Sequence, residues 1–318
     1  MNIVILDAYS VNPGDIDWAP IERFGSLKVY DNTPADEVAA RLKDADVVFT
    51  NRERIGEAEF AAAPNLRFLG LFATGYDKID LAAARKRGVA VCNVPGYSTD
   101  SVAQHAIALL LELTNRTRAL DAEVRKGRWT LRPGDCAWDE PIVALSGKTF
   151  GVLGTGAIGC AAARIAGALG MRVIGHSRSR RAAFAGTYVS LEELFGQSDV
   201  LSLHCAASEE TRGIVNRDTL AKMKRSAILI NTARGALVES GDLAEALNKG
   251  TIYAAGVDVV SSEPIRPDDP LLGAKNCLIT PHVAWMPVDV RKRLVEIAAE
   301  NLNAFLNGTR LNRVDLEG

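Results

Sequence analysis

The stretch from residue 148 to residue 178 constrains the fold more than any other part of the chain. A short, apolar and partly β-branched run at 149–153 is typical of a buried strand. The turn Gly154-Thr155-Gly156-Ala157-Ile158-Gly159 follows it directly, and an Ala-rich helical run at 160–169 and a second apolar run at 171–175 come next. Strand, glycine turn, helix and strand within about thirty residues predict one βαβ unit.

Each glycine of this turn has a physical task in the predicted unit. Gly154 allows a tight turn, Gly156 lets the backbone approach a pyrophosphate, and Gly159 lets helix and strand pack closely. The following helix presents free N–H groups and a partial positive charge to the phosphates. The segment therefore predicts a dinucleotide site, the alternative being a glycine turn without a ligand.

Bulk properties exclude several classes of function. The chain has 318 residues, enough for two ordinary domains, and its net charge of −2 without a long basic run argues against a nucleic-acid partner. The N-terminus lacks the features of a signal peptide, and no apolar run reaches membrane-spanning length. Five scattered cysteines without CxxC spacing predict reduced thiols, a cytoplasmic protein and no metal site.

Residues 1–98 show a strand–helix alternation that predicts a second parallel sheet covered on both faces. The expected strands are 3–6, 27–30, 47–50, 68–72 and 89–92, and the expected helices are 34–42, 57–62 and 81–87. No dinucleotide glycine pattern follows the first strand, so this domain has another task. Two loops lie beyond strand ends and are either substrate-binding or ordinary turns; their candidate residues are Arg52, Thr74, Gly75 and Tyr76.

The boundary between the domains is expected at the turn of residues 95–100. A helix is predicted from 101 to 114, continuing to about 126, and an irregular arm with Trp129 and Trp138 follows. The arm is either a subunit contact or packs on its own domain. A last helix, ending near 306, is expected to return to the first domain. The predicted domains are 1–98 with 286–318 for substrate binding and 99–285 for dinucleotide binding.

The predicted fold class is α/β with two doubly wound parallel sheets. One domain is a Rossmann dinucleotide-binding domain, and it is inserted into a flavodoxin-like substrate domain.

Polar residues recur where the later predicted strands, 199–203, 227–230, 253–257 and 277–279, come to an end. An open parallel sheet binds its ligands at that edge. The residues are His204 and Cys205, then Thr232, Ala233 and Arg234, then Asp258, and finally His282. His105 falls within the predicted helix and is interpreted as structural.

Two of these side chains, Arg234 and His282, form a candidate catalytic set with Glu263. Arg234 has the planar fork that binds a carboxylate by two donors, and His282 is a natural proton carrier near neutral pH. Glu263 lies in a loop after Asp258, and a carboxylate on one imidazole nitrogen stabilises the protonated ring. Each residue has an alternative interpretation. Arg234 is otherwise part of a surface salt bridge, His282 is a core histidine, and Glu263 is a solvated charge in a loop. Together the three suit the reversible reduction of a 2-oxoacid.

The end of the second predicted strand indicates which nicotinamide cofactor is used. An NAD site usually places Asp or Glu there to bond the ribose 2′-hydroxyl. Here Ser177 and Arg178 stand at that point, and no acidic residue occurs between Gly159 and Glu192. A serine removes the repulsion of a 2′-phosphate and a guanidinium binds it, so the sequence predicts NADP with NAD possible. The alternative is a plain surface turn in an NAD enzyme.

On these motifs the chain resembles the D-isomer-specific 2-hydroxyacid dehydrogenases over essentially its whole length, and within them the glycerate dehydrogenase/hydroxypyruvate reductase branch. The resemblance implies Arg234 as substrate binder, His282 as acid/base and Glu263 as its partner. It implies that Asp258, Thr232 and Ala233 help to place the nicotinamide. It also implies a homodimer built on the nucleotide-binding domain, with the arm of residues 117–141 crossing between subunits.

The expected activity is reduction of a small 2-oxoacid, hydroxypyruvate or glyoxylate, to D-glycerate or glycolate. The alternatives are a dehydrogenase for bulkier D-2-hydroxyacids and a cofactor-sensing, co-repressor-like interaction protein. The sequence departs from the family pattern at Ala206-Ala207 and at Met286-Pro287. The second departure follows Trp285, an expected substrate-binding residue, so it bears on which substrate is used.

Overall fold

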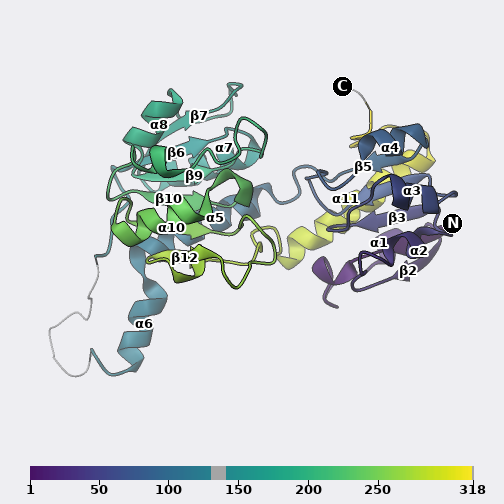
Figure 1. Cartoon of the computed structure of the whole chain (residues 1–318), viewed down its shortest axis with the longest axis horizontal. Coiled ribbons are helices and arrows are strands. Elements are labelled where there is room, and N and C mark those ends of the chain that lie inside the picture. The colour runs from purple at the N-terminus through teal and green to yellow at the C-terminus, as the bar shows by residue number, and fades with distance from the viewer. Residues whose placement is uncertain (130–140, 317–318) are drawn as a thin grey trace. The chain divides into compact units, whose positions relative to one another are not determined.

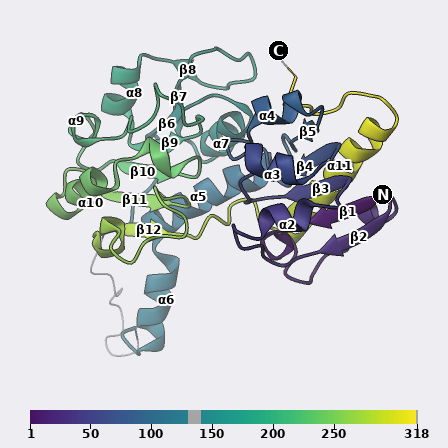
Figure 2. The same ribbon diagram turned by 45° about the vertical axis from the view of Figure 1, so that its right-hand side comes forward.

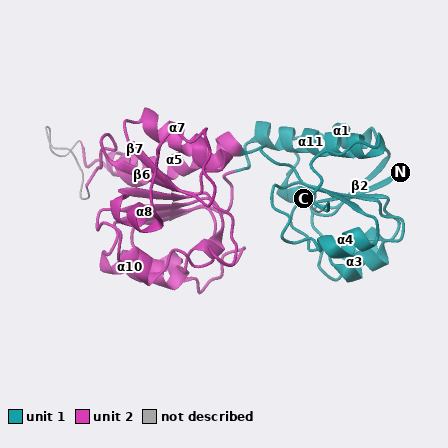
Figure 3. Ribbon diagram, turned by 90° about the horizontal axis from the view of Figure 1, so that it is seen from above, with its two compact units in different colours: residues 1–98, 285–318 teal, residues 99–284 magenta. Residues whose placement is uncertain are grey.

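The computed structural model describes residues 1–129 and 141–316 of the chain. The described chain divides into two compact units, residues 1–98 with 285–318 and residues 99–284 (Figure 3). The second unit is therefore inserted into the first, as the predicted fold class requires. Trp138 and Cys136, which lie in the predicted arm, are outside the described residues.

The first unit is a three-layer α/β domain. Its strands are β1 (Asn2–Ile5), β2 (Ser26–Val29), β3 (Val47–Thr50), β4 (Phe68–Leu71) and β5 (Ala90–Cys92). Its helices are α1 (Ala19–Glu22), α2 (Val38–Leu42), α3 (Glu57–Ala62), α4 (Leu81–Lys86) and α11 (Val288–Leu306). All strands of the described sheet are parallel in the order β2-β1-β3-β4-β5, which is the flavodoxin-like order.

The apolar character of β3 and β4 explains why helices cover both faces of this sheet. Every residue of these two strands is buried, so neither face of the sheet centre meets water. In Figure 3, α1 and α11 lie on one side of the sheet and α3 and α4 on the other. The C-terminal helix α11 contacts β4 and β5, and Asn301 on it donates a hydrogen bond to the carbonyl of Asn93.

The second unit contains the glycine motif. Its strands are β6 (Thr149–Leu153), β7 (Arg172–His176), β8 (Thr187–Tyr188), β9 (Val200–Leu203), β10 (Ile228–Asn231), β11 (Ala254–Val257) and β12 (Cys277–Ile279). Its helices are α5 (Thr99–Asn115), α6 (Thr117–Arg125), α7 (Ala157–Ala168), α8 (Leu191–Gln197), α9 (Arg217–Leu220) and α10 (Ser240–Lys249). Figure 3 shows α5 and α7 on one side of the sheet and α8 and α10 on the other.

The strand order of this second sheet places a switch point beside the glycine turn. In the described residues the order is β12-β11-β10-β9-β6-β7-β8 with parallel pairing throughout. The chain runs outward from β6 through β7 to β8, then returns to place β9 on the other side of β6. Parallel sheets bind ligands where the direction of winding reverses in this way.

Two predicted helices differ clearly from the structure, and the short strand β8 was not predicted. The helix expected to run to residue 126 ends at Asn115, because Arg116 adopts a left-handed backbone (φ 53°) and a separate helix α6 begins at Thr117. The helix expected from residue 34 begins at Val38. The two-residue strand β8 was not predicted, because it is too short to show a periodic pattern.

Helix α6 stands apart from the layers of its unit. None of its residues is buried, and it extends away from the sheet in both Figure 1 and Figure 2. Val124 on this helix and Trp129 just after it are exposed apolar side chains.

Candidate active site

The strands of the second unit end in register, so the residues that follow them form a row. Leu153 pairs with Leu203, Leu203 with Asn231, Asn231 with Val257, and Val257 with Ile279. The residues one position further on are Gly154, His204, Thr232, Asp258 and Thr280. The polar groups that the sequence placed at separate strand ends are therefore neighbours along one sheet edge.

The glycine turn has the geometry expected of a phosphate-binding turn. Gly154 has φ +97°, and a Cβ there would lie 2.6 Å from the backbone nitrogen of Cys205. A Cβ on Gly159 would lie 2.1 Å from the carbonyl oxygen of Gly154. A Cβ on Gly156 meets nothing within 4 Å, so this residue faces open space at the N-terminus of α7. Backbone crowding thus requires glycine at two positions, and the third leaves room for a ligand.

The remaining residues of the turn lie in and beside the first turn of α7. Ala157 is exposed and Ile158 is half-buried. The Thr155 side chain is buried, and its hydroxyl hydrogen-bonds to the hydroxyl of Tyr188 at 2.9 Å.

Two buried polar atoms at this edge have no hydrogen-bond partner within the described residues. They are Nδ1 of His204 and Oγ1 of Thr232, which follow β9 and β10. A buried polar atom without a partner is costly, so a ligand that supplies partners here is favoured. Burial lowers the pKa of His204 to about 4, and the ring is therefore neutral near pH 7. Its Nε2 bonds to the Ser202 hydroxyl at 2.9 Å.

These features fit a nicotinamide dinucleotide. Gly156 and the N-terminus of α7 have the space and the N–H groups for a pyrophosphate. The unpartnered atoms of His204 and Thr232 are positioned to receive polar groups at the same edge. The half-buried Ala233 donates its N–H to Oδ1 of Asn231, which fixes the turn after β10.

Arg234 projects from the turn that follows β10. It is exposed, and the nearby backbone carbonyl of Ala233 accepts a hydrogen bond from its Nη1 at 2.8 Å. The next residue must be glycine, because a Cβ on Gly235 would lie 1.9 Å from the carbonyl oxygen of Val260. Close backbone packing behind the arginine thus directs its side chain outward, where the planar fork is available for a carboxylate.

His282 and Glu263 form the pair expected from the sequence. Nδ1 of His282 lies 2.6 Å from Oε2 of Glu263, and both side chains are about one-third exposed (34% and 38%). Because a carboxylate accepts only, Nδ1 carries a proton and Nε2 is left to exchange one with a substrate. The structure thus brings His282 and Glu263 together from two loops that follow β11 and β12.

Asp258 is buried behind this pair. Burial alone raises the pKa of its carboxyl, but the nearby His105 ring and hydrogen bonds from the Thr280 hydroxyl and the N–H groups of Val283 and Ala284 outweigh it and lower the pKa below the usual range. The carboxylate is therefore charged at neutral pH. It holds the loop that carries His282, a supporting role that the strand-end pattern did not reveal.

Ser177 and Arg178 lie beyond β7, as predicted. Ser177 is half-buried and Arg178 is exposed, with its Nη1 4.0 Å from Oε2 of Glu210. The hydroxyl of Tyr188 accepts a hydrogen bond from the N–H of Arg181 at 2.7 Å, and the Arg180 guanidinium lies over the Tyr188 ring. Since Tyr188 also bonds to Thr155, it ties this basic turn to the glycine turn.

The first unit places its candidate residues in two loops at the carboxyl end of its own sheet. Arg52 and Tyr76 are exposed, and Gly75 is half-buried. The Thr74 hydroxyl donates to the carbonyl of Val94 at 2.9 Å, so it holds its loop to the next one.

Sequence reasoning missed Asp7, which organises the first of these loops. Its carboxylate accepts hydrogen bonds from the N–H groups of Asn51 and Arg52. Burial raises its pKa above the usual range despite these bonds. The signal was present, because Asp7 follows a buried strand in the same way as Asp258.

Trp285 belongs to the first unit by its contacts. It is 8% exposed and packs edge-on against Tyr97, with ring centroids 6.4 Å apart. Most of its surface is therefore covered by neighbouring residues.

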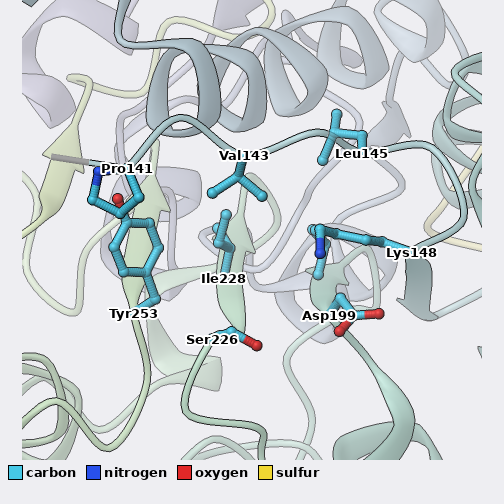
Figure 4. Close-up of a pocket in the computed structure, with 9 residues that line it drawn as sticks. Pro141, Val143, Leu145, Lys148, Asp199, Ser226, Ile228 and Tyr253 are labelled. Atoms are coloured by element: carbon cyan, nitrogen blue, oxygen red, sulfur yellow. The ribbon is translucent and has the colours of Figure 1, made fainter. Parts of the chain in front are cut away.

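A cavity of about 260 Å³ in the second unit lies at the opposite end of the sheet (Figure 4). Its lining includes Lys148, Asp199 and Tyr253, each of which comes just before a strand. Lys224 donates to Oδ1 of Asp199 at 2.8 Å, so this carboxylate is already paired. The cavity is thus at the amino ends of the strands, away from the glycine turn.

Within the described residues, the thiols and acidic groups form no second candidate site. In the described part of the chain Cys92, Cys160, Cys205 and Cys277 are free thiols. Burial raises the pKa of Cys92 and Cys277 to about 12 and that of Cys205 to about 11, so these thiols are weak nucleophiles. Within residues 1–129 and 141–316, no cluster of three metal-ligating side chains occurs, and no helix is long and apolar enough to cross a membrane.

Known proteins are similar to this chain in sequence and in fold. A family model described as the NAD binding domain of D-isomer specific 2-hydroxyacid dehydrogenases matches residues 107–284. A hydroxypyruvate reductase of Blautia hydrogenotrophica is 47% identical over 321 residues, covering 99% of this chain and 100% of that protein. A glyoxylate reductase of Korarchaeum cryptofilum is 41% identical over 280 residues, covering 85% and 82%.

A solved structure extends this likeness to three dimensions. The NADPH-dependent glyoxylate/hydroxypyruvate reductase of Sinorhizobium meliloti, in complex with citrate, matches with a TM-score of 0.84 and 31% identity over 98% of this chain and 97% of that one. Sequence, fold and strand-edge geometry agree, and the chain therefore belongs to the family of D-isomer-specific 2-hydroxyacid dehydrogenases, a family of NAD(P)-dependent oxidoreductases.

Proposed function

We propose that this enzyme reduces a small 2-oxoacid, hydroxypyruvate or glyoxylate, to D-glycerate or glycolate, with NADPH as the preferred cofactor. The observation that carries the proposal is the His282–Glu263 pair at 2.6 Å on the loops beyond β11 and β12, at the carboxyl edge from which Arg234 also projects. The names of the relatives support the substrate class.

The roles of the residues follow from their chemistry. The guanidinium of Arg234 binds the substrate carboxylate by two donors and polarises the adjacent carbonyl. Nε2 of protonated His282 gives its proton to the carbonyl oxygen, while Glu263 stabilises the imidazolium through Nδ1. NADPH, when bound, would supply the hydride for C2. Arg52, Thr74, Gly75, Tyr76 and Trp285 of the first unit are proposed to contact the substrate as well.

The cofactor is held by three groups of residues in this proposal. Gly154, Gly156 and the first turn of α7 bind the pyrophosphate, and Ser177 and Arg178 bind the 2′-phosphate. The nicotinamide end lies against the strand ends that carry His204, Cys205, Thr232, Ala233 and Asp258.

A panel of 2-oxoacids tests the activity directly. Purified protein is mixed with NADPH and each of hydroxypyruvate, glyoxylate, pyruvate and a bulky branched 2-oxoacid, and NADPH oxidation is followed. We expect the highest kcat/KM with hydroxypyruvate or glyoxylate. A preference for the bulky acid favours a dehydrogenase of larger D-2-hydroxyacids, and no turnover with any acid favours a cofactor-sensing protein.

The cofactor preference is a separate prediction. We expect kcat/KM for NADPH to exceed that for NADH at least about tenfold, or about 1.4 kcal/mol. The double substitution Ser177→Asp with Arg178→Ala should narrow or reverse the ratio of kcat/KM values. Arg180→Ala is the control, because it also removes a positive charge but at a residue that packs on Tyr188. It should change the ratio less. Affinities for adenosine 2′,5′-bisphosphate and AMP measure the same effect without turnover. Equal or better use of NADH by the wild-type enzyme contradicts the assignment.

We also propose a cytoplasmic homodimer assembled through the second unit. The unburied helix α6, with Val124 exposed, and Trp129 after it support this proposal. Light scattering should give twice the subunit mass of 34.1 kDa. A monomer at micromolar concentration contradicts the assembly.

A further inference from the structure

The catalytic histidine proposed above sits in a backbone conformation that needs support. His282 has φ +55°, in the left-handed region that side chains other than glycine rarely occupy. Its N–H donates to the carbonyl oxygens of Asp258 at 2.8 Å and Thr280 at 3.0 Å. The next two N–H groups, of Val283 and Ala284, donate to Oδ1 and Oδ2 of Asp258 at 2.9 and 3.0 Å. Asp258 therefore holds three successive N–H groups of this loop.

The Asp258 carboxylate is itself oriented by a side chain from a distant part of the sequence. Thr280 donates its hydroxyl hydrogen to Oδ1 of Asp258 at 2.6 Å. Nε2 of His105, in helix α5, lies 2.9 Å from the same Thr280 oxygen and 3.4 Å from Oδ1 of Asp258. Because the single hydroxyl hydrogen of Thr280 is used toward Asp258, the threonine oxygen accepts from the Nε2–H of His105. A chain of donors thus runs from His105 through Thr280 to Asp258.

The position of His105 on α5 makes this series of hydrogen bonds rigid. Its neighbours Ala103 and Ala106 are buried in the core between α5 and the sheet, so the helix does not shift easily. The His105 side chain is 23% exposed and reaches the strand-edge loop from that fixed base. A residue interpreted from the sequence as structural therefore contacts the network that holds the catalytic loop.

We propose that His105 is a positioning residue for His282. By donating to Thr280 it fixes the orientation of the Asp258 carboxylate, and that carboxylate holds the N–H groups of Val283 and Ala284 and so supports the left-handed backbone of His282. The catalytic role of His282 in this proposal rests on the proposed function. The effect of His105 on the geometry of the loop does not.

The test is a double-substitution cycle along the donor chain. His105→Leu and Thr280→Val each break one link, and each should lower kcat for 2-oxoacid reduction about tenfold while KM changes less than about threefold. Because both links act on one carboxylate, the double variant should be no slower than the slower single variant. His105→Gln keeps a donor near the position of Nε2 and should restore most of the rate. Thr114→Val is the matched control, since the Thr114 hydroxyl on the same helix bonds within α5 to the carbonyl of Leu110.

A second readout does not depend on turnover. Hydrogen exchange at the amides of Val283 and Ala284 should accelerate in His105→Leu and Thr280→Val, and should stay as in wild type in Thr114→Val. Losses that multiply in the double variant, no rescue by glutamine, or unchanged amide exchange would overturn the proposal. If the wild-type protein turns over no 2-oxoacid, the proposed function fails, while the exchange measurement still decides whether His105 holds the loop.

Discussion

Each unit carries a buried aspartate just beyond a strand of its parallel sheet, and the two behave in opposite ways. Asp7 and Asp258 are 3% and 1% exposed. Asp7 accepts bonds from two backbone N–H groups, and the Thr50 side chain also lowers its pKa, but burial prevails and the pKa is raised. Asp258 accepts bonds from two backbone N–H groups and from the Thr280 hydroxyl with His105 behind it, and its pKa is lowered. The balance between burial and the donors around each carboxylate thus sets the direction of its pKa shift.

The two sheet edges also differ in how their polar side chains are used. In the first unit, Asp7 and Thr74 use their polar atoms to hold neighbouring loops. In the second unit, Nδ1 of His204 and Oγ1 of Thr232 have no hydrogen-bond partner among the described residues, and the Nε2 of His282 faces away from its bond to Glu263. Two sheets of the same doubly wound kind thus differ in how many polar groups their loops leave for a ligand. Architecture selects the edge, and the side chains select the chemistry.

The strongest test of this contrast compares one arginine from each edge. Arg234→Lys keeps the charge but loses the two-pronged donor, and kcat/KM should fall roughly tenfold to several hundredfold, from about 1.4–3.5 kcal/mol of transition-state interaction. Arg52→Lys in the first unit should cost less than about tenfold. Steady-state kinetics with hydroxypyruvate measure both. Near-wild-type kinetics for Arg234→Lys, or equal losses in the two variants, would remove the distinction between the edges.

The two aspartates give a stability test of intermediate size. Asp258→Asn should lower the free energy of unfolding by about 2 kcal/mol, because charge-assisted bonds to several donors are lost. Asp7→Asn should cost about 1 kcal/mol or less, because removing the charge also removes its burial cost. Urea unfolding at pH 7 measures the two differences. Equal losses would show that the added donors to Asp258 do not matter.

The pH dependence of these differences should have opposite signs. The folded pKa of Asp258 lies below its ordinary value of 3.8, so its stabilisation is present above that pH and is lost as the pH falls through the folded pKa. The folded pKa of Asp7 lies above 3.8, so the folded state takes up the proton first and the contribution of Asp7 improves as the pH falls toward 3.8. Unfolding of wild type and both variants between about pH 2.5 and 6 checks both signs.

The last test concerns the His282–Glu263 pair of the second unit. Reduction needs protonated His282 and oxidation needs the neutral ring, so the two directions should show opposite pH trends about one midpoint. Glu263→Gln removes the charge that favours the imidazolium, and the rate of reduction at neutral pH should fall about tenfold, equivalent to about 1.4 kcal/mol. Rate profiles in both directions measure it. Profiles that overlay those of wild type would mean that the contact at 2.6 Å does not act in catalysis.

Most of the architecture could be predicted because it depends on local patterns. Buried strands such as β3 and β6 read as apolar runs, and the turn after β6 requires glycine for steric reasons that hold in any context. Helix α6 shows the limit of this approach. Arg116 breaks the helix with a left-handed backbone although neither glycine nor proline marks the position.

The sequence by itself determined the two parallel sheets, the inserted dinucleotide unit and the residue types at the strand ends. Only the tertiary structure decided which of these residues support others, as His105 and Asp258 do, and which keep a free polar atom, as His204 does. The reason is physical: residue type limits what a side chain is able to donate or accept, but its partner is set by strand register and by helices from distant parts of the chain. A histidine on α5 and an aspartate after β11 meet only because the folded sheet brings them together.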